Sequence, residues 1–350
     1  MKNFIPKKNG FFFPGEWETH DAVWLSWIHN KKTFFNKIKD VIHEYCMFIQ
    51  EVVKSEIVRI NVSNNLMEKE VKKNFLKYNI DLNKVEFFYN KTDDTWIRDY
   101  GPAFLVNSNR TKKIIIDWEY NAWGNKYLFY KFDNSIPNLI GKQINIPVIK
   151  KKIILEGGSI EFNGSGSILT SRACLLNKNR NFLLNKKEIE NILCNYYGQE
   201  EVLWVSNGIV GDDTDGHIDC TVRFINKNTV IAGLENNKFD ANYYFLRENL
   251  KALNKLKILN KDPINIVEIP MPNPIYYNNI RLPASYLNFY IANHAVIVPI
   301  FENKYDDKAL EIIQSCFPKK QVIGIRSLSI ISGLGSFHCL TQQEPKIIKK

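Results

Sequence analysis

Short apolar runs alternate with longer segments of helical periodicity along the chain. Residues 22–27, 57–62 and 85–89 are apolar runs typical of strands, whereas apolar side chains recur at helical spacing over 34–53 and 65–78. This alternation is typical of the α/β class, and its recurring unit is strand–strand–helix–strand. Further strands are expected over residues 114–120, 167–170, 201–205, 221–225, 230–233, 264–269, 295–300 and 321–325, and further helices over 186–197, 240–256 and 306–316.

The length and composition fit one globular domain. The chain has 350 residues, 45% of them hydrophobic, and no low-complexity linker divides it, so we expect a single domain over residues 1–350. No apolar run reaches the ~18 residues of a membrane span, and residues 1–8 lack the apolar core of an export signal. The 6 cysteines are scattered and form no Cys-x-x-Cys pair. We therefore expect a cytoplasmic protein with reduced thiols and no membrane partner.

The net charge of +10 raises nucleic acid as a partner. The lysines come in pairs and short runs spread along the chain, however, and they are not interleaved with aromatic residues on one evident face. We interpret them as a solvated basic exterior and expect no nucleic-acid partner. Salt-dependent retention on DNA would support the other interpretation.

An aromatic ring and a carboxylate lie three residues apart shortly after the expected strand 85–89. Trp96 and Asp99 could together hold a guanidinium group, because a carboxylate pairs with its N–H groups and an aromatic face attracts its charge. Arg98 offers another interpretation, an internal ion pair with a neighbouring acid. These residues alone leave both interpretations open.

Residues 211–220 carry four aspartates, at positions 212, 213, 215 and 219. In a chain of net charge +10, such a local negative site suits a small cationic ligand. His217 and Asp219 would lie on the same face if this segment were extended. An imidazole beside a carboxylate is what a proton-transfer site needs.

The spacing of the candidate ligands disfavours metal and dinucleotide sites. A calcium loop with Gly216 in its glycine position would begin at Gly211 and end at Val222, neither of which is a ligand. Residues 217, 219, 220, 338 and 339 include zinc-ligand types but no pair with structural-finger spacing. Gly157 and Gly158, between two expected strands within 153–164, either admit a close ligand or form a hairpin or bulge, and no G-x-G-x-x-G motif is present.

A single cysteine, Cys339, follows a run of small residues that includes Gly333 and Gly335. The two glycines allow turns closed to other residues, and this placement suits a thiol displayed at the lip of a pocket. Taken alone, the stretch fits a buried structural cysteine better, since free cysteine is among the most buried residue types.

Three stretches together resemble a known family. Residues 96–102, 213–219 and 335–343 are similar to the motifs of the agmatine deiminases, which belong with the bacterial-type peptidylarginine deiminases to the guanidino-group-modifying superfamily. The resemblance runs in order from about residue 11 to 345. Further matching stretches are residues 16–18, 121–124, 156–160, 174–181 and 284–290.

This resemblance implies a propeller of five strand–strand–helix–strand units around a pseudo-fivefold axis, with the active site at the central channel. It implies a hydrolase that needs no cofactor and no metal. By motif position, Cys339 would be the nucleophile, His217 the general acid and base, and Asp99 and Asp219 the carboxylates that bind guanidinium. The same resemblance implies that the substrate-binding residues are Trp96, Asp213, Glu156 and Trp123.

The implied reaction is hydrolysis of agmatine to N-carbamoylputrescine and ammonia, with agmatine as the small cationic partner. The first alternative is a deiminase of free or peptidyl arginine, whose carboxylate would call for an Arg or Lys at the pocket end, where Asp212 and Asp213 lie instead. The second is a non-catalytic binding protein for a small cation. A homo-oligomer stays open. The chain departs from the family pattern at Asn163, commonly Asp, at Cys220, often Asn, and at Asp213, more often Glu.

Overall fold

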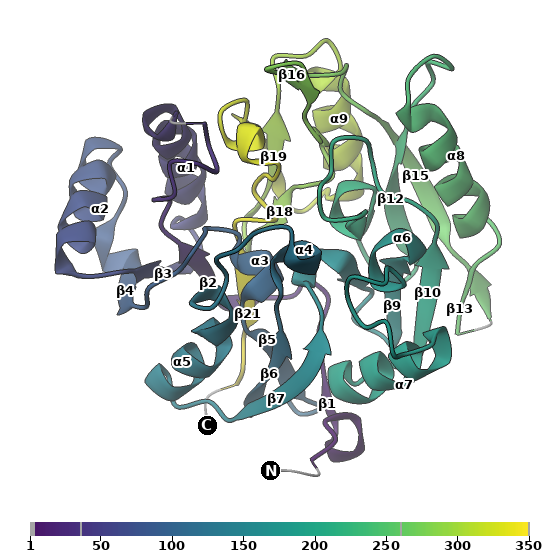
Figure 1. Cartoon of the computed structure of the whole chain (residues 1–350), viewed down its shortest axis with the longest axis horizontal. Coiled ribbons are helices and arrows are strands. Elements are labelled where there is room, and N and C mark those ends of the chain that lie inside the picture. The colour runs from purple at the N-terminus through teal and green to yellow at the C-terminus, as the bar shows by residue number, and fades with distance from the viewer. Residues whose placement is uncertain (1–3, 36, 260, 349–350) are drawn as a thin grey trace.

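The computed structural model describes residues 4–35, 37–259 and 261–348. Residues 1–3, part of the segment considered for an export signal, and residues 349–350 lie outside the described part. Within it, helices and strands form a mixed α/β fold with five sheets of three or four strands and two small two-stranded ribbons. The expected α/β class is therefore confirmed (Figure 1).

One order of elements recurs in the five larger sheets. A first strand pairs antiparallel with a second, a helix follows, and a third strand pairs parallel with the second. The first unit consists of β21 (Gln342–Pro345), β2 (His20–Ser26), α1 (Ile38–Val52) and β3 (Ile57–Val62), and the second of β5 (Ala103–Asn107), β6 (Lys113–Glu119), α5 (Ile136–Gln143) and β7 (Val148–Ile154). The third consists of β8 (Ile160–Phe162), β9 (Ser167–Ser171), α7 (Lys186–Tyr197) and β10 (Glu201–Val205), and the fourth of β11 (Val222–Phe224), β12 (Thr229–Leu234), α8 (Asn242–Leu253) and β15 (Asn265–Pro270). The fifth consists of β18 (Tyr290–Ile291), β19 (Ala295–Ile300), α9 (Asp306–Cys316) and β20 (Gln321–Arg326).

Strand β21, near the C-terminus, is the first strand of a unit whose second strand, β2, lies near the N-terminus. The two ends of the chain are therefore joined in one sheet, and this sheet is extended by β4 (Val85–Tyr89) beside β3. Strand β1 (Phe11–Phe12) extends the next sheet beside β5. The remaining described elements are α2 (Asn65–Lys77), α3 (Ile97–Tyr100), α4 (Ala122–Asn125), α6 (Arg172–Leu175), and the ribbons β13 (Lys257–Ile258) with β14 (Asp262–Pro263) and β16 (Tyr276–Tyr277) with β17 (Ile280–Arg281).

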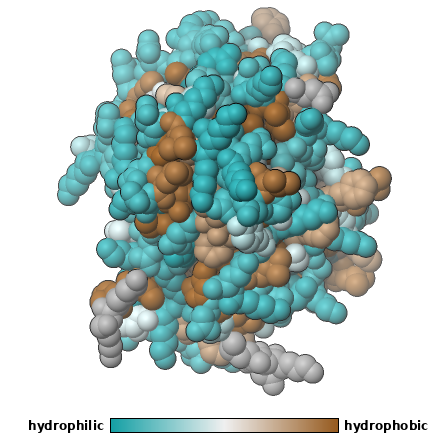
Figure 2. Space-filling model, turned by 90° about the vertical axis from the view of Figure 1, so that its left-hand side faces the viewer, coloured by the Kyte–Doolittle hydropathy of each residue, from teal (hydrophilic) through white to brown (hydrophobic). Residues whose placement is uncertain are grey.

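The helices pack one apolar stripe against the sheets and turn a polar face outward. Helix α2, for example, buries only Val71 and Phe75, and the face of the molecule that lies on the α1 and α2 side is mostly hydrophilic, with hydrophobic side chains in separate patches (Figure 2). None of the helices in the described ranges is both long and apolar enough to cross a bilayer.

Two expectations about individual elements are wrong. The helix expected from residue 34 begins at Ile38, because Phe35 has a positive φ of 48° that a helix does not allow. The double glycine at 157–158 does not form a hairpin, because β7 before it pairs with β6 and β8 after it pairs with β9. Strand β21 was not expected, and its side chains are polar although they are buried.

Candidate functional site

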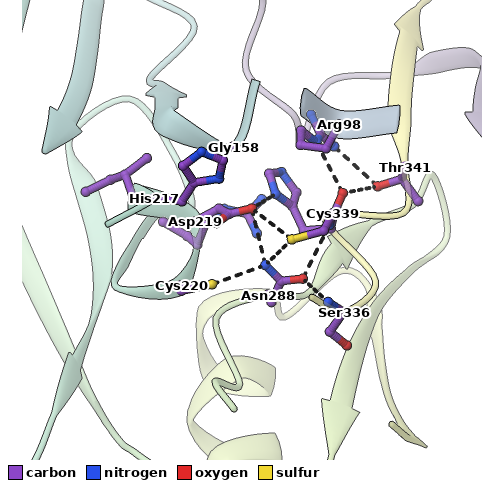
Figure 3. Close-up of polar contacts among 12 residues, drawn as sticks. Arg98, Gly158, His217, Asp219, Cys220, Asn288, Ser336, Cys339 and Thr341 are labelled. Atoms are coloured by element: carbon purple, nitrogen blue, oxygen red, sulfur yellow. Dashed lines mark hydrogen bonds and ion pairs between the residues drawn. The ribbon is translucent and has the colours of Figure 1, made fainter. Parts of the chain in front are cut away.

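Each of the five units has a short turn directly before its first strand, and these turns carry the candidate site. Asp99 lies in α3 before β5, Gly158 lies before β8, and Asp219 lies in the turn before β11. Asn288 lies two residues before β18, and Cys339 lies three residues before β21. Gly158, Asp219, Asn288 and Cys339 are far apart in sequence but lie together in space (Figure 3).

The thiol of Cys339 lies among polar side chains and is only 8% exposed. Its Sγ is 3.6 Å from Asp219 Oδ2 and 3.1 Å from Asn288 Nδ2. Asp219 Oδ1 accepts no hydrogen bond from any residue in the described ranges. The expectation of a thiol at the lip of a pocket is therefore only partly right, because Cys339 lines a cavity but lies at its buried end.

Asp99 is held in place by two donors and faces the predicted general base. Its Oδ2 accepts a hydrogen bond from Trp123 Nε1 at 2.9 Å, and its Oδ1 accepts one from the backbone N–H of Gly158 at 3.0 Å. The Nδ1 atom of His217 lies 3.6 Å from Asp99 Oδ1. Asp99 and His217 thus lie together, whereas the sequence predicted Asp219 as the carboxylate beside His217.

A side chain at residue 158 would collide with two residues predicted for catalysis. A Cβ at this position would lie 2.6 Å from His217 Nδ1 and 2.8 Å from Asp99 Oδ1, which is closer than atoms pack. The groups that approach the double glycine closely are therefore side chains of the candidate site, and the approach of a ligand stays a prediction.

The prediction that His217 and Asp219 share one face of an extended segment is wrong. Residues Ile218–Cys220 form a 3-10 turn, so the two side chains leave the backbone in different directions. Asp219 Oδ2 is instead 2.7 Å from Nδ1 of His338, whose Nε2 is 2.9 Å from Glu16 Oε2. A second imidazole, next in sequence to Cys339, therefore orients the carboxylate of Asp219.

The internal ion pair expected for Arg98 is confirmed, while the guanidinium site of Trp96 and Asp99 stays a prediction. Arg98 forms the internal ion pair, with Nη2 3.7 Å from Glu16 Oε2 and Nη1 2.6 Å from Gln343 Oε1. Trp96 and Asp99 meanwhile line the same cavity as Cys339. The Trp96 ring packs so closely on Gly335 that a Cβ there would lie 2.6 Å from it, which explains the glycine before the cysteine.

Trp123 is placed by a strained backbone. Ala122 and Trp123 both have a φ of 52°, in the left-handed region that bulky residues avoid. The Asn121 side chain accepts a hydrogen bond from Gly124 N, and the Trp123 indole bonds Asp99. Strain of this kind persists where surrounding contacts fix it, and it is common at functional sites.

Burial and the two carboxylates decide how the empty site ionises. Burial, reinforced by Asp219, raises the pKa of Asp99 well above its usual range. Burial would raise the pKa of Asp219, but the hydrogen bond from His338 and the electrostatic effects of His338, His217 and Arg223 together outweigh burial and lower that pKa to about 2. Burial lowers the pKa of His217 to about 3. Burial, with Asp219 and Asp99 nearby, raises the pKa of the Cys339 thiol, so the empty site favours a neutral imidazole and an unionised thiol.

Glu156 is fully buried and forms an ion pair with Arg180, and it is not among the residues that line the cavity with Cys339. Arg180 Nε donates to Glu156 Oε1 at 2.7 Å, and Arg180 Nη1 lies 2.6 Å from Asp215 Oδ2. Glu156 Oε2 and His217 Nε2 each lack a partner in the described part of the chain. The two residues lie together with Cys174, their donor atoms within 4.8 Å of one another.

This group of Glu156, Cys174 and His217 is the one cluster among the described residues that could hold a metal ion. Of the candidate zinc ligands in the sequence, it contains only His217. Glu156 Oε2 and His217 Nε2 do not form a hydrogen bond with each other.

The cavity that leads to Cys339 has a volume of about 530 Å³ and an acidic outer part. Asp213 lies there and accepts a hydrogen bond from the Tyr127 hydroxyl. Lys126 also lines this part, with Nζ 2.7 Å from Asp215 Oδ1. The described lining residues with ionisable side chains in this cavity, besides Cys339 and Tyr127, are Asp93, Asp94, Asp99, Asp133 and Asp213, with Lys32, Lys126 and Tyr120.

Most residues predicted for the site lie together. Cys339, Asp99, Trp96, Trp123 and Asp213 line the cavity, while His217 and Asp219 lie behind them and Glu156 lies behind His217. The sequence prediction missed four residues that contact the site: Asn288, His338, Arg180 and Tyr127. For Asn288, His338 and Arg180 a signal existed, since each lies in a stretch that resembles the family.

The comparisons with known proteins agree with this arrangement. The family model for Porphyromonas-type peptidyl-arginine deiminase matches residues 12–345. A Legionella pneumophila protein named "Putative agmatine deiminase" is 35% identical, over 98% of this chain and 97% of its own length. The structure of Enterococcus faecalis agmatine deiminase superposes with a TM-score of 0.93 at 27% identity, covering 99% of both chains. A cysteine-to-serine variant of C. jejuni agmatine deiminase with substrate bound gives 0.87 at 33% identity, covering 97% of both.

Proposed function

The chain belongs to the family of Porphyromonas-type peptidyl-arginine deiminases, and on this basis we propose that it hydrolyses agmatine to N-carbamoylputrescine and ammonia. The observation that carries the proposal is the position of one thiol, Cys339, 3.6 Å from the buried carboxylate of Asp219, in a cavity that also contains Asp99. Relatives named as agmatine deiminases match nearly the whole chain. Carboxylates of this kind can bind a guanidinium group through its N–H groups. A thiol in this position can attack the guanidinium carbon as a nucleophile.

In this proposal, the two carboxylates bind the planar cation. Asp219 Oδ1, which accepts no other hydrogen bond among the described residues, takes N–H groups from one side, and Asp99 takes them from another. The Trp96 ring lines the same cavity and packs along the bound plane, and Trp123 fixes Asp99. Both carboxylates orient the cation and draw positive charge onto its carbon.

The first chemical step joins Cys339 to the substrate. Sγ attacks the guanidinium carbon, and the thiol proton passes through His217 to one terminal nitrogen. The bond from carbon to that nitrogen breaks, ammonia leaves, and an amidino–cysteine adduct with one positive charge remains.

The second step releases the product. Water attacks the adduct carbon while His217 takes one of its protons, and the carbon–sulfur bond then breaks. The proton on His217 returns to the leaving sulfur and restores the thiol, and the second water proton passes to the released ammonia. The products are the neutral urea group of N-carbamoylputrescine and an ammonium ion, so charge and atoms balance.

Substrate helps to create its own nucleophile. Burial and two nearby carboxylates raise the pKa of Cys339 in the empty site, and a bound cation between them favours every ionised group around it. The thiolate therefore forms mainly in the complex, which protects the free enzyme's thiol from other electrophiles.

The outer part of the cavity accounts for the choice of agmatine. Agmatine carries a second positive charge at its far end, and the lining carboxylates, with Asp213 outermost near Tyr127, outnumber the lysines there. Free arginine is the second candidate, because Lys126 could meet a carboxylate. Lys126 is already paired with Asp215, however, so agmatine is favoured.

We also propose that the five units are the blades of a propeller around a pseudo-fivefold axis, within one domain over residues 1–350. The support is that the turns before five first strands carry residues of a single site. A crystal structure in which these sheets do not surround a common axis would contradict this. The homo-oligomer and the cytoplasmic location stay predictions.

The test of the function is an ammonia-release panel with agmatine, free arginine and an arginine-containing peptide, each at several concentrations. We expect kcat/KM to be highest for agmatine. A higher value for the peptide or for free arginine would overturn the substrate assignment, and no ammonia from any of the three would overturn the proposed reaction.

A further inference from the structure

Asn288 occupies the one turn of the five to which the sequence assigned no role. The other four turns carry Asp99, Gly158, Asp219 and Cys339, and all of these contact the reacting groups or one another. Asn288 lies two residues before β18, as Gly158 lies two residues before β8, whereas Asp219 and Cys339 lie three residues and Asp99 four residues before their strands. The Asn288 side chain points toward Asp219 and Cys339 (Figure 3).

The oxygen and the nitrogen of the Asn288 side chain both form hydrogen bonds with the segment that contains Ser336 and Cys339. Its Oδ1 accepts hydrogen bonds from the backbone N–H of Ser336 at 3.1 Å and of Cys339 at 3.3 Å. Its Nδ2 lies 3.1 Å from Cys339 Sγ and 3.2 Å from Asp219 Oδ2. The residue is 2% exposed, so water does not compete for these bonds.

The Nδ2 group has two hydrogens, and they match the two strongest acceptors around it. One is the Asp219 carboxylate and the other is the Cys339 sulfur, while the Cys220 sulfur lies farther away at 3.6 Å. Asn288 is thus a neutral donor placed between the ionised Asp219 carboxylate and a sulfur that becomes negative in the proposed reaction. The carboxylates of Asp219 and Asp99 oppose a thiolate at Cys339, and the Asn288 donor is one of the few groups that favour it.

We propose that Asn288 is a further catalytic residue, whose Nδ2 hydrogen bond stabilises the Cys339 thiolate and fixes its sulfur beside Asp219. This role rests on the proposed function, in which Cys339 is the nucleophile. A donor preorganised toward developing negative charge works as the donors of an oxyanion hole do, but here the charge is on sulfur.

Two substitutions separate the donor from the support of the loop. Asn288→Asp has nearly the same shape and keeps an oxygen that can accept from Ser336 N and Cys339 N, but it has no donor for the sulfur. Asn288→Ala removes the donor and the acceptor without adding a charge. Because the two variants share only the loss of the Nδ2 donor, an effect common to both reports on that hydrogen bond.

The matched control is Asn163→Asp. Asn163 is also buried, and its Oδ1 accepts from the backbone N–H of Ser165 and Ser167, both at 2.9 Å, while its Nδ2 donates to Lys227 O at 2.8 Å. It has the same pattern of hydrogen bonds as Asn288 but contacts no residue of the site. Thermal unfolding of all three variants shows which of them are folded.

The first measurement follows alkylation of Cys339 by iodoacetamide without substrate, as a function of pH, by mass spectrometry of the peptide that contains it. We expect the pH at which alkylation becomes fast to move upward in both Asn288 variants and to stay unchanged in Asn163→Asp. The second measurement is kcat for agmatine, which should fall about 10- to 100-fold in the Asn288 variants, the effect of losing a hydrogen bond to a charged group.

An alkylation profile and a kcat like those of the unmodified protein, in a folded Asn288→Asp or Asn288→Ala variant, would overturn the role of Asn288. The alkylation shift does not depend on agmatine. If it appears while the unmodified protein releases no ammonia from agmatine, the proposed function fails and the thiolate-stabilising contact stands.

Discussion

His338 lies between two buried carboxylates, with Nδ1 2.7 Å from Asp219 Oδ2 and Nε2 2.9 Å from Glu16 Oε2. Burial alone would raise the pKa of the Asp219 carboxyl, and the hydrogen bond from His338 is among the contacts that outweigh burial and lower that pKa. In the proposed reaction, the residue before the nucleophile thus helps to prepare the carboxylate that binds the substrate.

Replacing His338 by Asn should weaken the binding of guanidinium in a pH-dependent way. Without the imidazole, the pKa of Asp219 rises, so fewer molecules present the carboxylate at low pH. We expect kcat/KM for agmatine to fall by about 10- to 100-fold, and to fall further at pH 6 than at pH 8. Equal losses at both pH values would show that His338 does not act through the ionisation of Asp219.

His217 should make folding stability depend on pH. Burial lowers the pKa of His217 from its ordinary 6.5 to about 3, so between these pH values the unfolded chain binds a proton that the folded chain does not. This contribution to stability is complete above about pH 6.5 and is lost as the pH falls toward 3.

The measurement for His217 is urea unfolding at several pH values between 7 and 4. The free energy of unfolding should fall less with acidification in His217→Gln than in the unmodified protein. His43→Gln is the control, because His43 is exposed on α1, and it should keep the original slope. A His217→Gln slope identical to the original would contradict the burial of a neutral imidazole.

Arg180 should matter for stability rather than only for activity. Arg180 has a fully buried guanidinium that pairs with Glu156 and Asp215, so Arg180→Ala leaves the Glu156 carboxylate buried without its charge partner. We expect a loss of about 3–5 kcal/mol in the free energy of unfolding. Lys308→Ala, which breaks an exposed pair with Glu311, should cost no more than about 1 kcal/mol. Similar losses in the two variants would contradict the buried ion pair.

Asp213 should determine affinity for the far end of agmatine. Asp213→Asn keeps the shape but removes the charge that faces the second ammonium group, so KM for agmatine should rise about 10- to 100-fold with little change in kcat. The same variant should not raise KM for free arginine, whose far end carries a carboxylate. A fall in kcat with unchanged KM would place Asp213 at the reacting carbon instead.

Local signals in the sequence predicted many element boundaries. Helix α7 begins and ends where expected, because Asn185 and Glu188 form a capping box and Gly198 adopts the left-handed conformation at its end. Strand β21 could not be predicted in this way. Its Gln342, Gln343 and Glu344 are polar, and they are buried only because distant partners such as Trp24 and Lys113 bond Glu344.

The resemblance to a family supplied the site's nucleophile, base and carboxylates, but not their supporting residues. The partnership of His338 with Asp219 depends on the 3-10 turn at 218–220, which no local pattern indicates. The role inferred for Asn288 depends on contacts between turns that precede different first strands. Such contacts arise from tertiary structure, so a single sequence does not reveal them.

The most direct test of the central claim is mass spectrometry of enzyme quenched in acid during turnover of agmatine. The account predicts an amidino adduct on the peptide that contains Cys339, absent when agmatine is omitted and absent in Cys339→Ala, which should release no ammonia. Ammonia release by Cys339→Ala at the rate of the unmodified enzyme, or an adduct on another cysteine, would contradict the account.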